Sequence, residues 1–178
     1  MRFTVVAVVA GLVIGLALGG RPRHLAGRGL RLWPLLFAGV AVQAVGARVG
    51  DTLGYVLLVA SYPLLLGFAA ANVRLVGMAL VGIGLLMNLA TIATNRGMPV
   101  RRSAIVAAGI ATDEEVASLH IAAKHHLERP SDRLMPLSDI IPVPGLHEVL
   151  SFGDLVLSVG VADTIVHLLR PPRRGRHT

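Results

Sequence analysis

Three aspartates, Asp132, Asp139 and Asp154, are the side chains of this sequence best suited to chemistry. Asp154 lies about one turn inside an apolar run, and a carboxylate at that depth in a membrane is costly unless it is paired, hydrated or protonated. Two neighbouring carboxylates, one with a raised pKa, are the usual arrangement for acid–base catalysis. Asp154 together with Asp132 or Asp139 is therefore a candidate catalytic pair.

Asp154 also has a structural interpretation. It follows Ser151 and Phe152 and so lies in a first helical turn. A carboxylate there meets exposed backbone amides and the positive end of the helix dipole. Both interpretations are open at the level of the residues.

Two asparagines precede these aspartates. Asn88 lies in the middle of an apolar run and is suited to hydrogen bonding between helices. Asn95 ends the same run, about level with Asp154, so these two side chains can meet.

The sequence contains no motif for metal binding, thiol chemistry or nucleotide binding. The chain has no cysteine, which excludes disulfides, thiol nucleophiles and cysteine-held metals. The histidines at positions 120, 125, 126 and 147 show no HExxH motif or other regular ligand spacing. There is no GxSxG, phosphate loop or dinucleotide fingerprint. We therefore expect no metal and no cofactor.

The composition indicates a membrane protein. Of the 178 residues, 54% are hydrophobic and 15% charged, and the mean hydropathy is +0.70, well away from soluble proteins. A helix needs about twenty apolar residues to cross the hydrocarbon core. We predict an all-α membrane protein, one domain over residues 1–178, with five transmembrane helices. The predicted spans cover about residues 3–20, 32–47, 53–71, 75–94 and 152–169.

Arginines orient these spans, because basic residues are enriched in cytoplasmic loops. They cluster after the first span and after the fifth, and Arg74 lies between the third and fourth. We predict that these segments, with the carboxyl terminus, are cytoplasmic, and that the amino terminus and residues 95–150 are outside. The net charge of +7 then indicates topology and contact with anionic lipid. Nucleic acid is not an expected partner.

Residues 95–150, called the cap below, are predicted to be folded, because a structureless connection of this length is unusual. Thr112 and Glu115 form a capping-box pattern. We therefore predict an amphipathic helix from Thr112 to Leu127, on the membrane surface or on the spans. The next stretch, RPSDRLMPLSDIIPVPGLHEVL, contains four prolines, which exclude a helix and favour ordered coil or short edge strands.

The motifs NRGMPV, LSDIIPVPG and SFGDLVLSVG, in this order, resemble the bacterial integral-membrane family catalogued as domain of unknown function 5317. Its pattern is an N-x-G-x-M-P-V-like exit from a span, an L-x-D-x-I-P stretch and an S-x-G-D start of the last span. The matching residues are Asn95, Gly97, Met98, Pro99, Val100, Leu137, Asp139, Ile140, Pro142, Ser151, Gly153 and Asp154. Arg96 departs from the pattern, where a small residue or a second glycine is expected. The resemblance covers essentially the whole chain and implies a bacterial cell membrane, but no activity.

A second resemblance is to signal peptidase II, an aspartyl protease of the outer half of the membrane. The stretch DRLMPLSDIIP, followed by SFGDLVLSVG, is similar to the D-R…D-F and N-x-A-D-x-A-I arrangement of that family. This implies Asp132 and Asp154 as the acid pair. The chain departs from that family because Asp132 follows a polar helix instead of closing a span, and because Asn-x-Ala-Asp is absent.

We expect a scaffold or subunit that is surrounded by the lipid bilayer and has another membrane protein as its partner. In this reading Asn95, Asp139 and Asp154 hold the cap onto the spans. The further residues expected to be structural or substrate-binding are Asn88, Gly97, Pro99 and Ser151. The alternative is an outer-leaflet aspartyl-type hydrolase that acts on a lipid-linked substrate through Asp154 with Asp132 or Asp139. A small transporter is the third reading.

Overall fold

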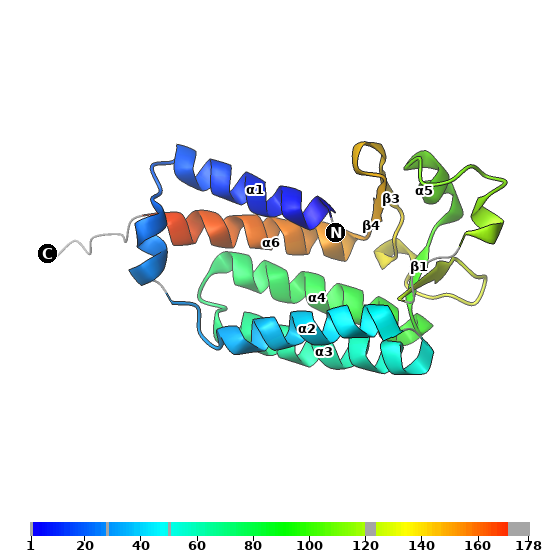
Figure 1. Ribbon diagram of the computed structural model, residues 1–178, viewed down its shortest axis with the longest axis horizontal. Coiled ribbons are helices and arrows are strands. Elements are labelled where there is room, and N and C mark those ends of the chain that lie inside the picture. Colours follow the sequence, from blue (N-terminus) through cyan, green and yellow to red (C-terminus); the bar gives the residue numbers. More distant parts are fainter. Residues whose placement is uncertain (1, 28, 50, 120–123, 171–178) are drawn as a thin grey trace, which may run out of the picture.

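The computed structural model describes residues 2–27, 29–49, 51–119 and 124–170. This part of the chain forms an elongated bundle of long helices with a body of short elements at one end (Figure 1). The long helices are α1 (Arg2–Ala17), α2 (Trp33–Val49), α3 (Asp51–Ala71), α4 (Val76–Asn95) and α6 (Phe152–Leu169). The helix η1 (Pro22–Gly27) follows α1 at the other end. The prediction that the five apolar runs are helices is confirmed.

Three of these helices are long and apolar enough to cross a membrane. They are α3 over Thr52–Ala71, α4 and α6, which provide 20, 20 and 18 residues. The helices α1 and α2 are also apolar but have 16 and 17 residues. The fold therefore supports three membrane crossings directly, by length and composition.

Helix α6 lies between α1 and α4 and packs against both (Figure 1). Glycines seven residues apart face each other between α4 and α6, with Gly77 against Gly160 and Gly84 against Gly153. A Cβ on Gly84 would lie only 2.6 Å from the carbonyl oxygen of Gly153. The glycines therefore let the two backbones approach closely, as small residues do between membrane helices.

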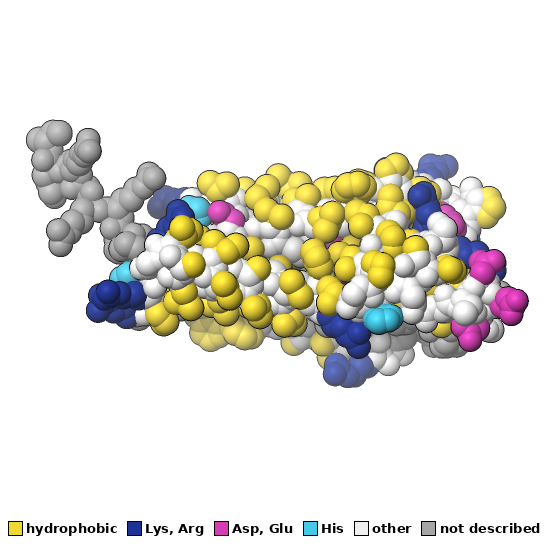
Figure 2. Space-filling view, turned by 90° about the horizontal axis from the view of Figure 1, so that it is seen from above, with side chains coloured by type: hydrophobic (Ala, Val, Ile, Leu, Met, Phe, Trp, Pro, Cys, Tyr) yellow, Lys and Arg dark blue, Asp and Glu magenta, His cyan; other side chains and the backbone are white. Residues whose placement is uncertain are grey.

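The long sides of the bundle are covered by hydrophobic side chains, as Figure 2 shows. Val5, Phe37 and Val159 are 61%, 64% and 59% exposed. Monomeric soluble proteins rarely expose a continuous apolar surface of this extent. The charged side chains gather toward the two ends of the molecule (Figure 2). Such a surface is suited to an apolar solvent along its middle.

The cap consists of short elements stacked on one end of the bundle (Figure 1). They are β1 (Met98–Val100), α5 (Arg102–Ala107), η2 (Val116–Ser118), β2 (His125–Leu127), η3 (Met135–Leu137), β3 (Ile141–Val143), η4 (Pro144–Leu146) and β4 (Glu148–Leu150). Strand β1 pairs with β2 in parallel, and β3 pairs with β4 in antiparallel. The proline-rich stretch contains the predicted coil and short strands, β3 and β4, and also two single-turn 3₁₀ helices, η3 and η4, which were not predicted.

The predicted amphipathic helix from Thr112 to Leu127 is wrong. The carboxylate of Glu115 does accept hydrogen bonds from the amide and the hydroxyl of Thr112, both at 2.9 Å. Only a turn and η2 follow, residues 120–123 lie outside the described part, and His125–Leu127 is a strand. The strand is favoured because β1 satisfies its backbone. The all-α prediction is corrected to a mostly helical fold with two small sheets.

Candidate functional site

The chain leaves α4 through a turn with two consecutive positive φ angles. Arg96 has φ 54°, in the left-handed region, and Gly97 has φ 149°. The amide of Gly97 donates to the carbonyl of Ile92 at 3.0 Å. A Cβ at Gly97 would also lie 3.0 Å from Nδ1 of His126. Arg96 occupies a left-handed position at the end of the helix where glycine is common, which explains why glycine was expected there.

Asn95 joins the end of α4 to the cap. Its side-chain amide donates to the carbonyl of Arg133 at 2.8 Å, and its Oδ1 accepts from the Arg133 amide at 2.8 Å. The side-chain amide also donates to the carbonyl of Thr91 at 3.0 Å. Asn95 therefore holds the 129–133 loop, and the asparagine bonded to Asp154 is Asn88 instead.

Asp154 is the third residue of α6 and forms a capping box with Ser151. The Ser151 hydroxyl accepts from the Asp154 amide at 3.0 Å, and the Asp154 carboxylate accepts from the Ser151 amide at 3.1 Å. This arrangement satisfies two of the free donors at the helix start. The structural interpretation of Asp154 therefore matches its local geometry.

Asn88 connects this cap motif to α4. Its side-chain amide donates to Asp154 Oδ1 at 2.8 Å, and its Oδ1 accepts from the Ser151 hydroxyl at 3.0 Å. Asn88 and Ser151 are buried, with 7% and 0% of their surfaces exposed. The three side chains form a closed polar cluster between the two helices, at the end that carries the cap.

Asp139 is buried beside β1. Its backbone bridges to Val100, and its amide donates to the Pro99 carbonyl at 3.0 Å. Its Oδ2 lies 3.3 Å from Nε2 of His125. Its Oδ1 is buried without a hydrogen-bond partner among the described residues. Pro99 thus lies in β1 between Asp139 on one edge and β2 on the other.

The pKa of the Asp139 carboxyl lies above its ordinary value. Burial is the largest cause and raises the pKa, while the hydrogen bond and the charge of His125 lower it. The negative charge of Asp154 raises it further, and the positive charge of Lys124 lowers it. A half-satisfied buried carboxyl of this kind favours its protonated form.

Asp132 is held within the cap by His126. Nε2 of His126 lies 3.2 and 3.1 Å from the two carboxylate oxygens, and the Arg129 amide donates to Oδ2 at 2.8 Å. Among the described residues no interaction joins Asp132 to Asp154. The charge of Asp154 therefore acts on the carboxyl of Asp139, whereas the carboxylate of Asp132 interacts with His126.

His125 and His126 were missed as site residues because they were assigned to a helix. On a strand, adjacent side chains point to opposite faces, and each of these histidines meets a different aspartate. The sequence of two adjacent histidines therefore indicates two different partner residues only when these histidines are known to lie on a strand.

Glu148 is a further residue that sequence reasoning missed. Its carboxylate accepts from the backbone amides of Arg2 at 2.7 Å and Phe3 at 2.9 Å. Burial acts to raise the pKa of the Glu148 carboxyl and these amide bonds act to lower it, and the pKa lies below its ordinary value. Glu148 thus joins β4 to the first turn of α1. The two segments are 146 positions apart, so no local pattern reveals the contact.

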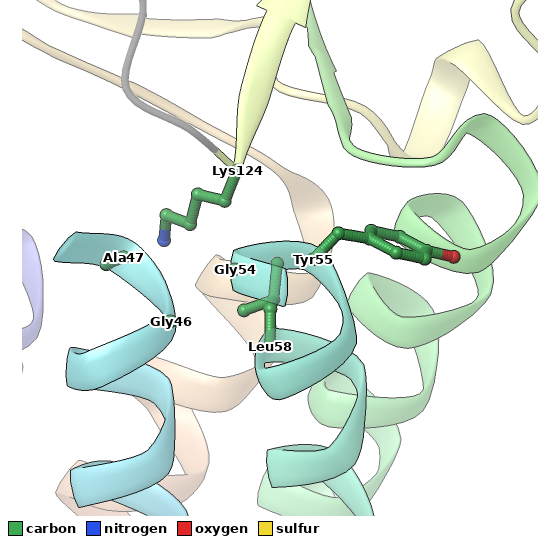
Figure 3. A pocket seen from close by; sticks show the side chains of 6 residues that line it. All are labelled: Gly46, Ala47, Gly54, Tyr55, Leu58 and Lys124. Atoms are coloured by element: carbon green, nitrogen blue, oxygen red, sulfur yellow. The ribbon is translucent and has the colours of Figure 1, made fainter. Parts of the chain in front are cut away.

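The hollow beside Lys124 is small. Lys124, just before β2, extends over the adjacent ends of α2 and α3, next to Gly46, Gly54 and Tyr55 (Figure 3). The space measures about 10 Å³, which is roughly the room of one water molecule. It is too small for a substrate as it stands.

Comparison with known proteins bears on the family and not on the activity. No curated protein and no solved structure matches the chain. The model of a family of unknown function, DUF5317, matches residues 30–166. The matched range includes the turn after α4, Asp139 and the Asn88–Ser151–Asp154 cluster. Because the match extends over most of the chain, this protein belongs to the DUF5317 family of unknown function.

Proposed function

We propose that this protein is a non-catalytic scaffold or subunit that spans a bacterial cell membrane five times and carries a rigid cap outside the cytoplasm. Three helices of sufficient length support the membrane location. The shorter helices α1 and α2 are flanked by further apolar residues, Leu18 and Leu32 among them, which extend their apolar length toward that of a crossing.

The distribution of charge supports the orientation. Arg74 lies in the link between α3 and α4, at the end of the bundle away from the cap, and Arg21 and Arg170 follow α1 and α6 at that same end. Acidic side chains gather at the end that carries the cap (Figure 2). Arginine-rich ends tend to face the cytoplasm, which supports the proposal that the cap and the start of α1 lie outside.

The observation that carries the proposal is the set of hydrogen bonds that the Asp154 carboxylate accepts. Its Oδ2 accepts from the Ser151 amide and closes the capping box of α6, and its Oδ1 accepts from Asn88 and joins the start of α6 to α4. Asn95 and Glu148 make comparable connections from the cap to α4 and to α1. A cap fixed at three helix ends is a stable surface for a partner membrane protein.

Substituted cysteines test the location directly, because the native chain contains none. Glu114→Cys, on the exposed part of the cap, should react with a membrane-impermeant maleimide in intact cells. Arg23→Cys should react only after permeabilisation. The reverse pattern, or equal labelling of both, would overturn the orientation.

The scaffold role is tested by assembly. A photo-crosslinking amino acid at Glu114 should give one discrete larger species in cells. Asp154→Ala removes the bonds from Ser151 and Asn88 at the start of α6, so it should loosen the cap and abolish that species while the protein remains in the membrane. If the species persists although hydrogen exchange shows a released cap, the fixed cap is not the partner surface.

One observation favours a second candidate function. Asp139 is buried, its Oδ1 has no hydrogen-bond partner in the described part of the chain, its pKa is raised, and it lies within the electrostatic influence of Asp154. A pair of carboxyls at this place has the chemistry to activate water and to donate a proton to a leaving group on a lipid-linked substrate. The acid pair of such a hydrolase would be Asp139 and Asp154, since Asp132 is engaged with His126.

Asp139→Asn distinguishes the two functions. A hydrolase should lose all cleavage of a fluorogenic lipopeptide in reconstituted vesicles, while hydrogen exchange shows that the cap is still folded. A scaffold should show no cleavage in the wild type. Asp132→Asn is the matched control, because that carboxylate lies in the cap outside the pair.

A further inference from the structure

The end of the bundle opposite the cap contains a hollow that nothing above explains. It measures about 190 Å³ and lies between residues 29–31, the α3–α4 link and the end of α6. Arg31 and Arg74, from two separate segments of the chain, line it together with Leu30, Leu75 and Leu168, which are apolar. A hollow with two cations and an apolar wall at a helix end is suited to an amphipathic anion.

The hollow is built by a buried side chain. Asn72 is 7% exposed. Its Oδ1 accepts from the Arg31 amide, and its side-chain amide donates to the Arg31 carbonyl, both at 2.8 Å. A third bond at 2.8 Å runs to the Phe68 carbonyl. The reciprocal pair fixes the backbone of Arg31 against the end of α3, so one wall of the hollow is held in place before any ligand arrives.

The two arginines are available to a ligand. Neither guanidinium forms an ion pair with a carboxylate in the described part of the chain. The nearest acidic residue along α6, Asp163, lies 3.2 Å from His167. An arginine side chain is suited to bind phosphate through two parallel N–H groups.

From this geometry we propose that the hollow binds the phosphate headgroup of an anionic phospholipid, with Arg31 and Arg74 on the phosphate and the acyl chains along the apolar sides of the helices. The inference rests on the membrane placement proposed above. Apolar side chains cover the long side of the bundle (Figure 2), and Leu30, Leu75 and Leu168 line the hollow itself, which favours a lipid over a free phosphate. Basic pockets between membrane helices at the cytoplasmic side are known to take such headgroups.

Trp33 allows a direct measurement. It is the single tryptophan of the chain and lies two positions after Arg31. The full chain in detergent is titrated with dioctanoyl phosphatidylglycerol while Trp33 fluorescence is followed. Dioctanoyl phosphatidylcholine and inorganic phosphate serve as comparison ligands. We expect saturable binding of the phosphatidylglycerol and at least tenfold weaker binding of the other two.

Variants assign the binding to the hollow. Arg31→Gln and Arg74→Gln should each weaken phosphatidylglycerol binding about fivefold, and the double variant about twentyfold, from the usual contribution of one basic residue near an anionic lipid surface. Arg23→Gln is the matched control, an exposed arginine of η1 that does not line the hollow. It should change the affinity less than twofold. Circular dichroism checks that every variant keeps its helix content.

Several results overturn the proposal. Equal affinity for phosphatidylcholine would show that the net charge of the headgroup does not contribute to binding. Equal affinity for inorganic phosphate would show that the acyl chains do not contribute to binding. A loss with Arg23→Gln as large as with the double variant shows general attraction instead of a site. Cysteine labelling of the topology is independent of this titration, so a wrong orientation and a missing lipid site give different results.

Discussion

Asp154→Asn is the sharpest perturbation of the polar cluster at the cap. The substitution keeps the shape of the side chain and one acceptor, which can still receive the bond from Asn88. It replaces the oxygen that accepts from the Ser151 amide. A hydrogen bond to a charged group contributes about 1.5–3 kcal/mol, and a carboxylate at a helix start about 0.3–1 kcal/mol. We expect Asp154→Asn to lower the free energy of unfolding by about 2 kcal/mol.

Asp154→Ala removes both acceptors and leaves the donors of Ser151 and Asn88 unpaired, so its cost should be about 3–5 kcal/mol. Asp163→Asn is the control on the same helix. Asp163 pairs with His167 four positions on, and such pairs contribute about 0.3–0.5 kcal/mol. The assay is unfolding in mild detergent by titration with dodecyl sulfate, with hydrogen exchange at the amides of Met98 and Val100 in β1 as the local readout. If Asp154→Asn matches the wild type in both measurements, Asp154 does not hold the cap.

Three further predictions concern the cap. Gly97→Ala should lower the free energy of unfolding by about 1–3 kcal/mol, because alanine is strained at φ 149° and its Cβ meets His126. Gly145→Ala is the control, because the space around Gly145 is open, and it should change the free energy of unfolding little in the same titration. The pKa of the Glu148 carboxyl is lowered in the folded protein, so its stabilising effect is present above the unfolded pKa and is lost as pH falls through the folded pKa. Glu148→Gln should remove this acid dependence from hydrogen exchange at the start of α1. An unchanged acid dependence would contradict the role of Glu148 in joining β4 to α1. The pKa of the Asp139 carboxyl is raised in the folded protein, so its contribution to cap stability is complete below the ordinary aspartate pKa and is lost as pH rises through the folded pKa. Asp139→Asn should flatten that part of the profile of cap stability against pH. A profile identical to that of the wild type would contradict this role of Asp139.

The helices of this protein follow from local sequence. Runs such as 75–94 are apolar on every side, so they predict buried or lipid-facing helices whatever the rest of the chain does. The turn after α4 was also local, because Asn95 and Gly97 carry signals for a helix end. The start of α6 was indicated in the same way by Ser151 with Asp154.

The cap was less predictable, because its elements are stabilised from outside. Thr112 and Glu115 do form the local bond that the capping-box pattern indicates. The helix nevertheless fails to continue, since β1 offers the backbone of His125–Leu127 a strand partner 27 positions back along the chain. Strand pairing of three residues leaves almost no pattern in a sequence. A local propensity was therefore overridden by a distant contact.

The sequence by itself determined where the apolar helices lie, where α4 ends and that Asp154 begins α6, because each depends on residues within a few positions of one another. Only the tertiary structure decided the partners of the polar groups: Asn88 with Asp154, His125 with Asp139, His126 with Asp132 and Glu148 with the start of α1. The physical reason is that a hydrogen bond depends on positions within about 3 Å. Residues on different elements reach that distance only once the helices and the cap have packed.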